Sequence, residues 1–150
     1  MKCKELQIGD WITDKNGFQW QIIGVGDDYA YATFEGNEGD PWEFNDKDDQ
    51  PEGIPLTKEM LDANGFRYEH DYVDFYRSII GSHHYTSSMW CACVEWCKTS
   101  EGRKICYIEC VKAEDGKEGS ATIWREFYVH TLQHALRFVG LSEIADNFKV

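Results

Sequence analysis

Short apolar runs alternate with turn residues over the first 40 residues, in the pattern of a β-meander. Aromatic and β-branched residues gather in three runs, at residues 10–13, 19–24 and 29–34. Asn16-Gly17 separates the first two runs. An Asn-Gly pair between apolar runs predicts a β-hairpin, because both residues tolerate the positive φ angles of a type I′ turn. The pattern therefore predicts a small, strongly bent antiparallel sheet.

An acidic stretch and a short helix follow this sheet. Residues 35–52 contain eight acids and one lysine, which predicts a loop, or an edge strand with a loop. Thr57 is a plausible helix N-cap and Asn64-Gly65 is a helix stop signal, so we expect a helix over residues 58–63. A helix of under two turns is unstable alone and must pack on a sheet.

The second half of the chain predicts further antiparallel strands and then a long helix. The expected strands are residues 72–80, 88–98, 104–113 and 121–127, and the expected turns are residues 81–84, 100–102 and 115–119. Strand runs followed by a helix, without the strand and helix alternation of a parallel sheet, indicate the α+β class.

These elements predict an α+β protein with an N-terminal β-meander or small SH3-like barrel, a short helix, and a C-terminal antiparallel sheet packed by a terminal helix. Residues 1–56 would form the first lobe and residues 57–150 the second, with a single shared domain as the alternative.

The last helix, expected over residues 127–140, separates an apolar face from a polar face at about 100° per residue. The apolar face should pack on the protein and consists of Tyr128, Leu132, Ala135, Leu136 and Val139. The polar face should be presented to solvent and to a protein partner, and consists of His130, Gln133, His134 and Arg137.

Composition and charge narrow the functional classes. An aromatic share of 15% argues for a folded chain. The balance of 15 basic and 27 acidic residues gives a net charge of −12, which repels nucleic-acid phosphates and anionic membranes alike. Because neither a signal peptide nor a membrane span is evident, we expect a cytoplasmic protein with reduced cysteines. Exposed sheet edges in the second half of the chain would allow a homodimer about a two-fold axis.

Five cysteines of the second half form one candidate metal site. They would share a sheet face if the loop between their strands had two or four residues, whereas three or five residues would reverse their parity. They are Cys91, Cys93, Cys97, Cys106 and Cys110. Zinc sites usually use CxxC pairs, which the chain lacks, so small buried core residues are the favoured interpretation.

His130 and His134 form the other candidate metal site, because side chains at i and i+4 share a helix face. This spacing is half of a zincin motif, but Thr131 occupies the position of the general base. No P-loop, nucleophile elbow or dinucleotide-binding motif is present, so we expect no catalytic residues and no cofactor. A metal-binding protein or enzyme that uses the two histidines stays an alternative hypothesis.

The acidic stretch allows a third hypothesis. An EF-hand fails, because Pro51 stands where the loop requires glycine. If the acids of residues 35–52 formed one continuous patch, the protein could instead mimic nucleic acid and occupy a basic protein.

Two segments carry a resemblance to a known group. The segment Ile-Pro-Leu-Thr at residues 54–57 and the segment Tyr-Val-His-Thr-Leu-Gln at residues 128–133 resemble small proteins of gut anaerobes and their prophages, which have no assigned activity. The resemblance implies a mobile-element context. It also implies that His130 and Gln133 dock the helix or a partner. Together these patterns favour a non-catalytic cytoplasmic interaction or accessory module. The resemblance adds the expectation that this module derives from a phage.

Overall fold

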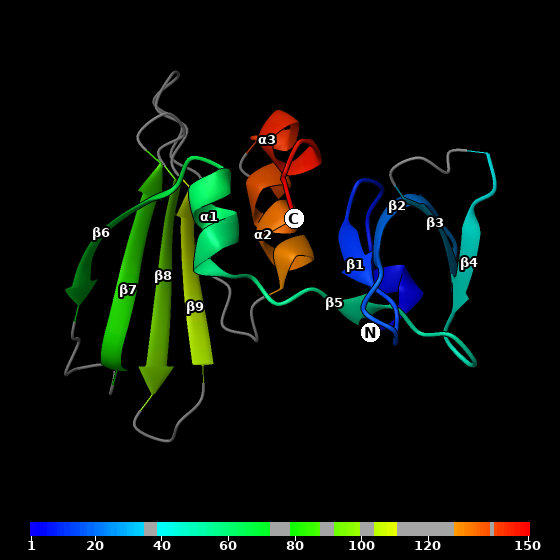
Figure 1. Ribbon diagram of the computed structural model, residues 1–150, viewed down its shortest axis with the longest axis horizontal. Coiled ribbons are helices and arrows are strands. Elements are labelled where there is room, and N and C mark those ends of the chain that lie inside the picture. The colour runs from blue at the N-terminus through cyan, green and yellow to red at the C-terminus, as the bar shows by residue number, and fades with distance from the viewer. Residues whose placement is uncertain (35–38, 73–78, 88–91, 100–103, 111–127, 139) are drawn as a thin grey trace. The chain divides into compact units, whose positions relative to one another are not determined.

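The chain divides into two compact units (Figure 1). The structure, a computed structural model, describes residues 1–34, 39–72, 79–87, 92–99, 104–110, 128–138 and 140–150. The first unit comprises Met1–Pro55, Tyr128–His134 and Val150, and the second comprises Leu56–Phe127 and Ala135–Lys149. Residues 128–134 thus belong to the first unit, although in the sequence they lie between the two segments of the second unit.

A curled five-stranded antiparallel sheet, in the order β4-β3-β2-β1-β5, forms most of the first unit (Figure 1). Its elements are the 3₁₀ helix η1 (Cys3–Glu5) and the strands β1 (Trp11–Thr13), β2 (Gln19–Val25), β3 (Tyr29–Thr33), β4 (Trp42–Asn45) and β5 (Glu52–Gly53). The three predicted strands are confirmed. The acidic stretch supplies both edge strands, of which β5 was not predicted.

The first hairpin forms where Asn16-Gly17 predicted it, but with a different turn. The Gly17 amide donates to the Asp14 carbonyl at 3.0 Å, so the tight turn encloses the residues before Gly17. The Asp14 carboxylate accepts from the Asn16 amide at 2.8 Å and the Phe18 amide at 3.0 Å, and Gly17 has a φ of +86°. The type I′ expectation was wrong, because the Asp14 side chain stabilises a longer loop that ends in a left-handed glycine.

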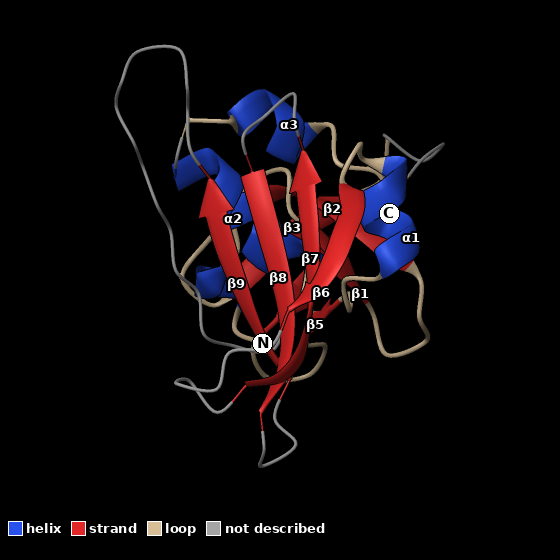
Figure 2. Ribbon diagram, turned by 90° about the vertical axis from the view of Figure 1, so that its left-hand side faces the viewer, coloured by secondary structure: helices blue, strands red, loops and turns tan. Residues whose placement is uncertain are grey.

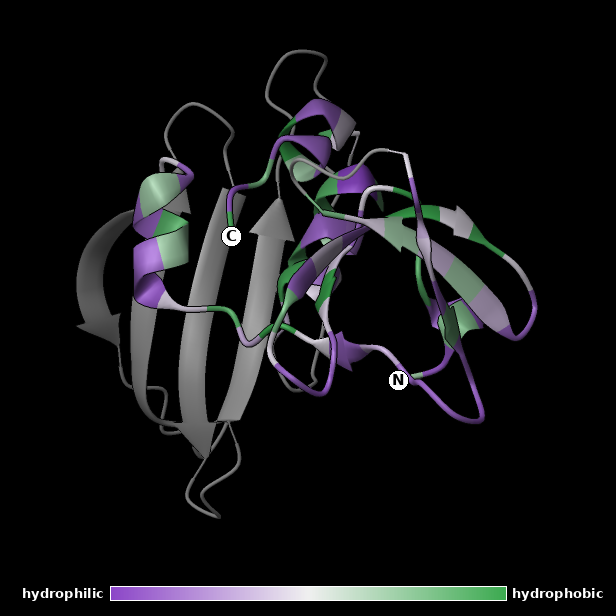
Figure 3. Cartoon of the chain, turned by 45° about the vertical axis from the view of Figure 1, so that its right-hand side comes forward, coloured by the Kyte–Doolittle hydropathy of each residue, from purple (hydrophilic) through white to green (hydrophobic). Residues whose placement is uncertain are grey.

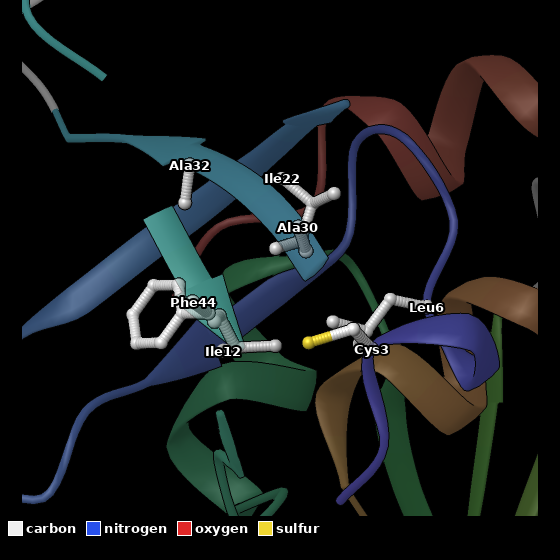
Figure 4. Close-up of a cluster of buried hydrophobic side chains, with 7 residues drawn as sticks. All are labelled: Cys3, Leu6, Ile12, Ile22, Ala30, Ala32 and Phe44. Carbon is white, nitrogen blue, oxygen red and sulfur yellow. The ribbon is translucent and has the colours of Figure 1, made fainter. Parts of the chain in front are cut away.

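The core of the first unit is a cluster of buried side chains from the strands and the N-terminal segment (Figure 4). Alternating residues of the strands contribute Ile12, Ile22, Ala30, Ala32 and Phe44, and the N-terminal segment adds Cys3 and Leu6. The Cys3 amide donates to the Asp46 carboxylate at 2.8 Å. Burial, together with Asp46, raises the pKa of the Cys3 thiol to about 11, so this cysteine stays protonated.

Tyr128 packs directly on the backbone of β5. A methyl group at Gly53 would lie 2.4 Å from the Tyr128 ring, and the Val129 amide donates to the Ile54 carbonyl at 2.9 Å. We expect Gly53→Ala to lower the free energy of unfolding by about 2 kcal/mol, because the ring and the strand must separate. Urea unfolding measures the change. Gly24→Ala is the matched control, since its new methyl group would meet Tyr31 at an ordinary 3.6 Å; equal losses in both variants would contradict the prediction.

The short helix of the second unit, α1 (Lys58–Ala63), has the predicted bounds. Thr57 Oγ1 accepts from the Met60 amide at 3.2 Å, which confirms the N-cap, and Gly65 follows the helix with a φ of +81°. The Asn64 side chain donates to the Lys149 carbonyl and accepts from the Lys149 amide, both at 2.8 Å. Asn64 therefore ends the helix and also holds the C-terminal segment.

The second sheet is antiparallel, in the order β6-β7-β8-β9 (Figure 2). Its strands are β6 (Arg67–Tyr72), β7 (Ile79–Ser87), β8 (Ala92–Thr99) and β9 (Lys104–Cys110). Strands β8 and β9 confirm the strands predicted at residues 88–98 and 104–113. The predicted turn at residues 81–84 is wrong, because residues 82–84 pair with β6 on one side and β8 on the other. The predicted strand at 121–127 and the turns at 100–102 and 115–119 lie outside the described residues.

The register of β8 and β9 decides the cysteine hypothesis. Cys106 pairs with Trp96 and Cys110 pairs with Ala92, whereas Cys93 pairs with Glu109. Directly paired positions belong to the same face of a sheet. Cys106 and Cys110 therefore fall in the opposite alternation set from Cys93, so the condition for one shared cysteine face is not met; Cys91 lies outside the described residues. The cause is a connection of odd length between the paired residues Lys98 and Lys104.

The predicted terminal helix is present as α2 (Val129–Phe138). It ends in a Schellman motif, in which the Leu141 amide donates to the Leu136 carbonyl at 2.8 Å and Gly140 has a φ of +85°. An additional short helix, α3 (Ser142–Asp146), follows and was not predicted. Val139, which the sequence placed on the apolar face of α2, lies outside the described residues.

Candidate functional site

The polar side of α2 lies against the N-terminal turn of the first unit. The residues that meet there, which we call the polar cluster, are Asp10, Tyr128, His130, Gln133 and His134. Asp10 and Gln133 are completely buried. Buried polar groups destabilise a fold unless they are hydrogen-bonded, so their partners define what the cluster does.

Gln133 bonds to the backbone on both sides of Asp10. Its Oε1 accepts from the Trp11 amide and its Nε2 donates to the Gly9 carbonyl, each at 2.9 Å. The side-chain amide thereby acts as a backbone substitute that ties the helix to the start of β1. Only a residue that carries both a donor and an acceptor can satisfy both groups.

Asp10 organises the turn that precedes β1. Its Oδ2 accepts from the Gln7 amide at 2.8 Å and lies 2.7 Å from His134 Nε2, which donates to it. The Asp10 main chain also accepts from the Ile22 amide at 2.9 Å. A carboxylate bound in this way fixes the His134 ring, as a carboxylate does when it orients a histidine base or a metal-ligating histidine.

His130 lies beside the Asp10–His134 pair and is buried. Its ring stacks on Tyr128 at a centroid distance of 5.5 Å and meets His134 edge-on at 5.8 Å. Its Nδ1 is buried without a hydrogen-bond partner. Burial lowers the pKa of His130 to about 4, although the Asp10 carboxylate favours the charged form. His130 is therefore neutral at neutral pH.

The presented polar face predicted for α2 is wrong for two of its four residues. Gln133 is fully buried and His130 is only 8% exposed, because the helix has protein on this side as well. His134 is partly exposed and bonded to Asp10. Arg137 forms an ion pair with Asp146 of α3 at 3.0 Å, within the second unit. The contacts of these four residues are therefore with other parts of the same chain.

The predicted approach of His130 and His134 is present, with their rings in edge contact. Over the part of the chain that the structure describes, no three side chains of His, Cys, Asp or Glu gather in a way that could hold a metal ion. Asp10 is the cluster member that the sequence did not indicate. Its partner His134 is 124 residues away in the sequence, and no local pattern reports such a contact.

A second feature, which the sequence did not single out, is an aromatic cluster of the first sheet, to which the central strand β2 and the edge strand β4 both contribute. We call it the aromatic edge, and it consists of Trp20, Phe34 and Trp42. The Trp20 ring lies 5.2 Å from Phe34, perpendicular to it, and 6.0 Å from Trp42. Trp20 also contacts the core through Phe44 at 5.9 Å. Trp42 is 50% exposed and Phe34 is 41% exposed.

An acidic side chain adjoins the aromatic edge. The Trp42 indole N–H donates to Asp49 Oδ2 at 2.8 Å, and Lys15 Nζ lies 3.9 Å from the other carboxylate oxygen. The hydropathy colouring shows hydrophobic strand segments next to hydrophilic loops in this unit (Figure 3). The sequence did contain a signal, namely Pro41-Trp42 inside an acidic stretch, but it could not bring Trp20 and Phe34 to the same place.

Comparisons with known proteins found no match among family models, curated proteins or solved structures. Within the described segments, no helix combines the length and apolar character that a membrane crossing requires. The polar cluster and the aromatic edge are therefore the features of the described residues that bear on function.

Proposed function

We propose that the protein is a non-catalytic interaction or accessory module of the cytoplasm, and that the aromatic edge is its recognition surface. The observation that carries this proposal is the exposure of Trp42 and Phe34 side by side with Trp20. Tryptophan and other aromatic residues are enriched where proteins bind one another, because they bury a large area with few rotatable bonds.

The contacts of α2 support this choice of surface. Gln133 forms hydrogen bonds with the backbone of Gly9 and Trp11, and Asp10 forms one with His134. Arg137 forms an ion pair with Asp146. Side chains with such intramolecular partners stabilise the fold, whereas Trp42 and Phe34 keep a large exposed apolar area. The helix α2 therefore stabilises the fold, and the aromatic edge provides the recognition surface.

The other hypotheses gain less support from the described residues. For metal binding by His130 and His134, the described residues bring no third His, Cys, Asp or Glu side chain into place as a ligand. Mimicry of nucleic acid needs one continuous acidic patch over residues 35–52, and residues 35–38 of this stretch lie outside the described residues. The phage-related origin implied by the resemblance stays a prediction.

Affinity capture with single variants tests the proposal. We expect the unaltered protein to retain a defined set of proteins from an extract of its source cells, and Trp42→Ala to lose them. Phe18→Ala is the matched control, because Phe18 is an aromatic residue of the same unit that is 68% exposed. Thermal unfolding shows that each variant is folded. Retention of the same proteins by Trp42→Ala, or loss with both variants alike, would contradict the proposal.

A further inference from the structure

We infer that the aromatic edge binds a cationic side chain, arginine above all, in a basic peptide segment of a partner protein. This inference rests on the proposed function and adds the chemistry of the partner. It combines three observations on the first unit: the clustered rings, the carboxylate beside them, and a cation of the chain itself that already lies at that carboxylate.

The rings provide the first part of a cation site. Trp20 is half-buried and contacts Phe34 and Trp42 at 5.2 and 6.0 Å, so three aromatic side chains from separate segments converge. Contact with Phe44 of the core holds Trp20 in place at 5.9 Å. Aromatic faces attract cations, tryptophan most strongly, and a guanidinium group also stacks on them. A rigid Trp20 with exposed neighbours suits such a group.

Asp49 provides the second part. One carboxylate oxygen accepts from the Trp42 indole, which fixes both side chains, and the other lies 3.9 Å from Lys15 Nζ. The Lys15 side chain is 70% exposed, so this ion pair is weak and readily exchanged. The pair shows that a cation is accommodated beside Trp42. An arginine from a partner could replace Lys15 and bind Asp49 with two parallel hydrogen bonds.

Charge decides between the possible occupants. The chain carries a net charge of −12, which opposes the approach of nucleic acid and of a second copy of the same chain. The same charge attracts a basic segment and accelerates its association. A basic peptide is therefore the occupant that both the local and the overall electrostatics favour.

Peptide titration tests the inference. The probes are an arginine-rich synthetic peptide and the same peptide with glutamine at each arginine, titrated into the full chain and followed by tryptophan fluorescence. We expect the arginine peptide to bind and the glutamine peptide to bind at least about tenfold more weakly. Trp42→Leu leaves the charge unchanged and should weaken binding of the arginine peptide about tenfold.

Charge-matched variants separate a local site from general attraction. Asp49→Asn and Glu59→Gln each remove one negative charge, but Glu59 belongs to α1 of the second unit. We expect Asp49→Asn to weaken binding several-fold and Glu59→Gln to change it little. Equal affinity of the unaltered protein and Trp42→Leu, or equal effects of the two charge variants, would overturn the inference.

The two proposals fail in distinguishable ways. If cellular capture depends on Trp42 but the arginine peptide binds no better than the glutamine peptide, the cationic partner is refuted and the recognition surface stands. If neither capture nor peptide binding depends on Trp42, both proposals are refuted.

Discussion

Replacement of Gln133 by methionine is expected to lower the free energy of unfolding by about 3 kcal/mol. Methionine has nearly the same length and suits a buried helix position, so packing is largely kept. The loss arises because the Trp11 amide and the Gly9 carbonyl, which the fully buried Gln133 satisfies at 2.9 Å each, would lose that partner in a part-buried position. An unsatisfied buried group costs about 1–3 kcal/mol.

Equilibrium unfolding in urea at neutral pH measures this effect. The matched control is Gln19→Met, which makes the same chemical change at an exposed position of β2 and should alter stability by less than about 0.5 kcal/mol. Gln133→Asn adds a second comparison, because it keeps the amide group but is too short to reach both backbone groups. A loss for Gln133→Met no larger than that of Gln19→Met would show that the bonds of Gln133 do not hold the helix to the turn.

Local patterns predicted the elements of this fold well, because the signals are contained in a few neighbouring residues. Thr57 and Asn64-Gly65 bounded α1 correctly, since an N-cap side chain and a left-handed glycine act within one turn of the helix. The apolar runs of the N-terminal meander likewise predicted β1, β2 and β3.

Predictions failed where distant segments decide the outcome. Gln133 and His130 have the helical spacing of an exposed polar face, yet a turn from the other end of the chain covers them. Residues 81–84 contain turn-forming types, but they belong to β7, and residues 82–84 pair with strands on both sides. Helical periodicity reports which residues share a face and not what that face meets.

The aromatic edge shows the same limit for function. Trp42 is visible in the sequence as an aromatic residue among acids, and Trp20 is visible as a strand residue. Their 6.0 Å contact depends on the pairing of β2 with β3 and of β3 with β4. A candidate site assembled from three segments thus becomes evident only when the sheet order is known.

His130 should make the stability of the protein sensitive to mild acid. Its pKa lies at about 4 in the folded protein, below the ordinary value of 6.5, because burial outweighs the favourable Asp10 carboxylate and His134 adds to the lowering. Between these two pH values the unfolded chain binds a proton at His130 that the folded chain does not bind. The contribution of His130 is therefore complete above pH 6.5 and is lost as the pH falls towards 4.

The substitution His130→Phe isolates the pH-dependent contribution of His130 to the free energy of unfolding. Phenylalanine keeps a flat ring against Tyr128 and binds no proton, and all carboxylates that titrate in the same range are common to both proteins. Relative to the wild type, the variant should gain roughly 2–3 kcal/mol when the pH is lowered from about 7 to about 4.5. Urea unfolding at the two pH values measures the gain. Parallel stability curves for the two proteins would mean that His130 is protonated in the fold as easily as in the unfolded chain, and hence that the ring is not desolvated.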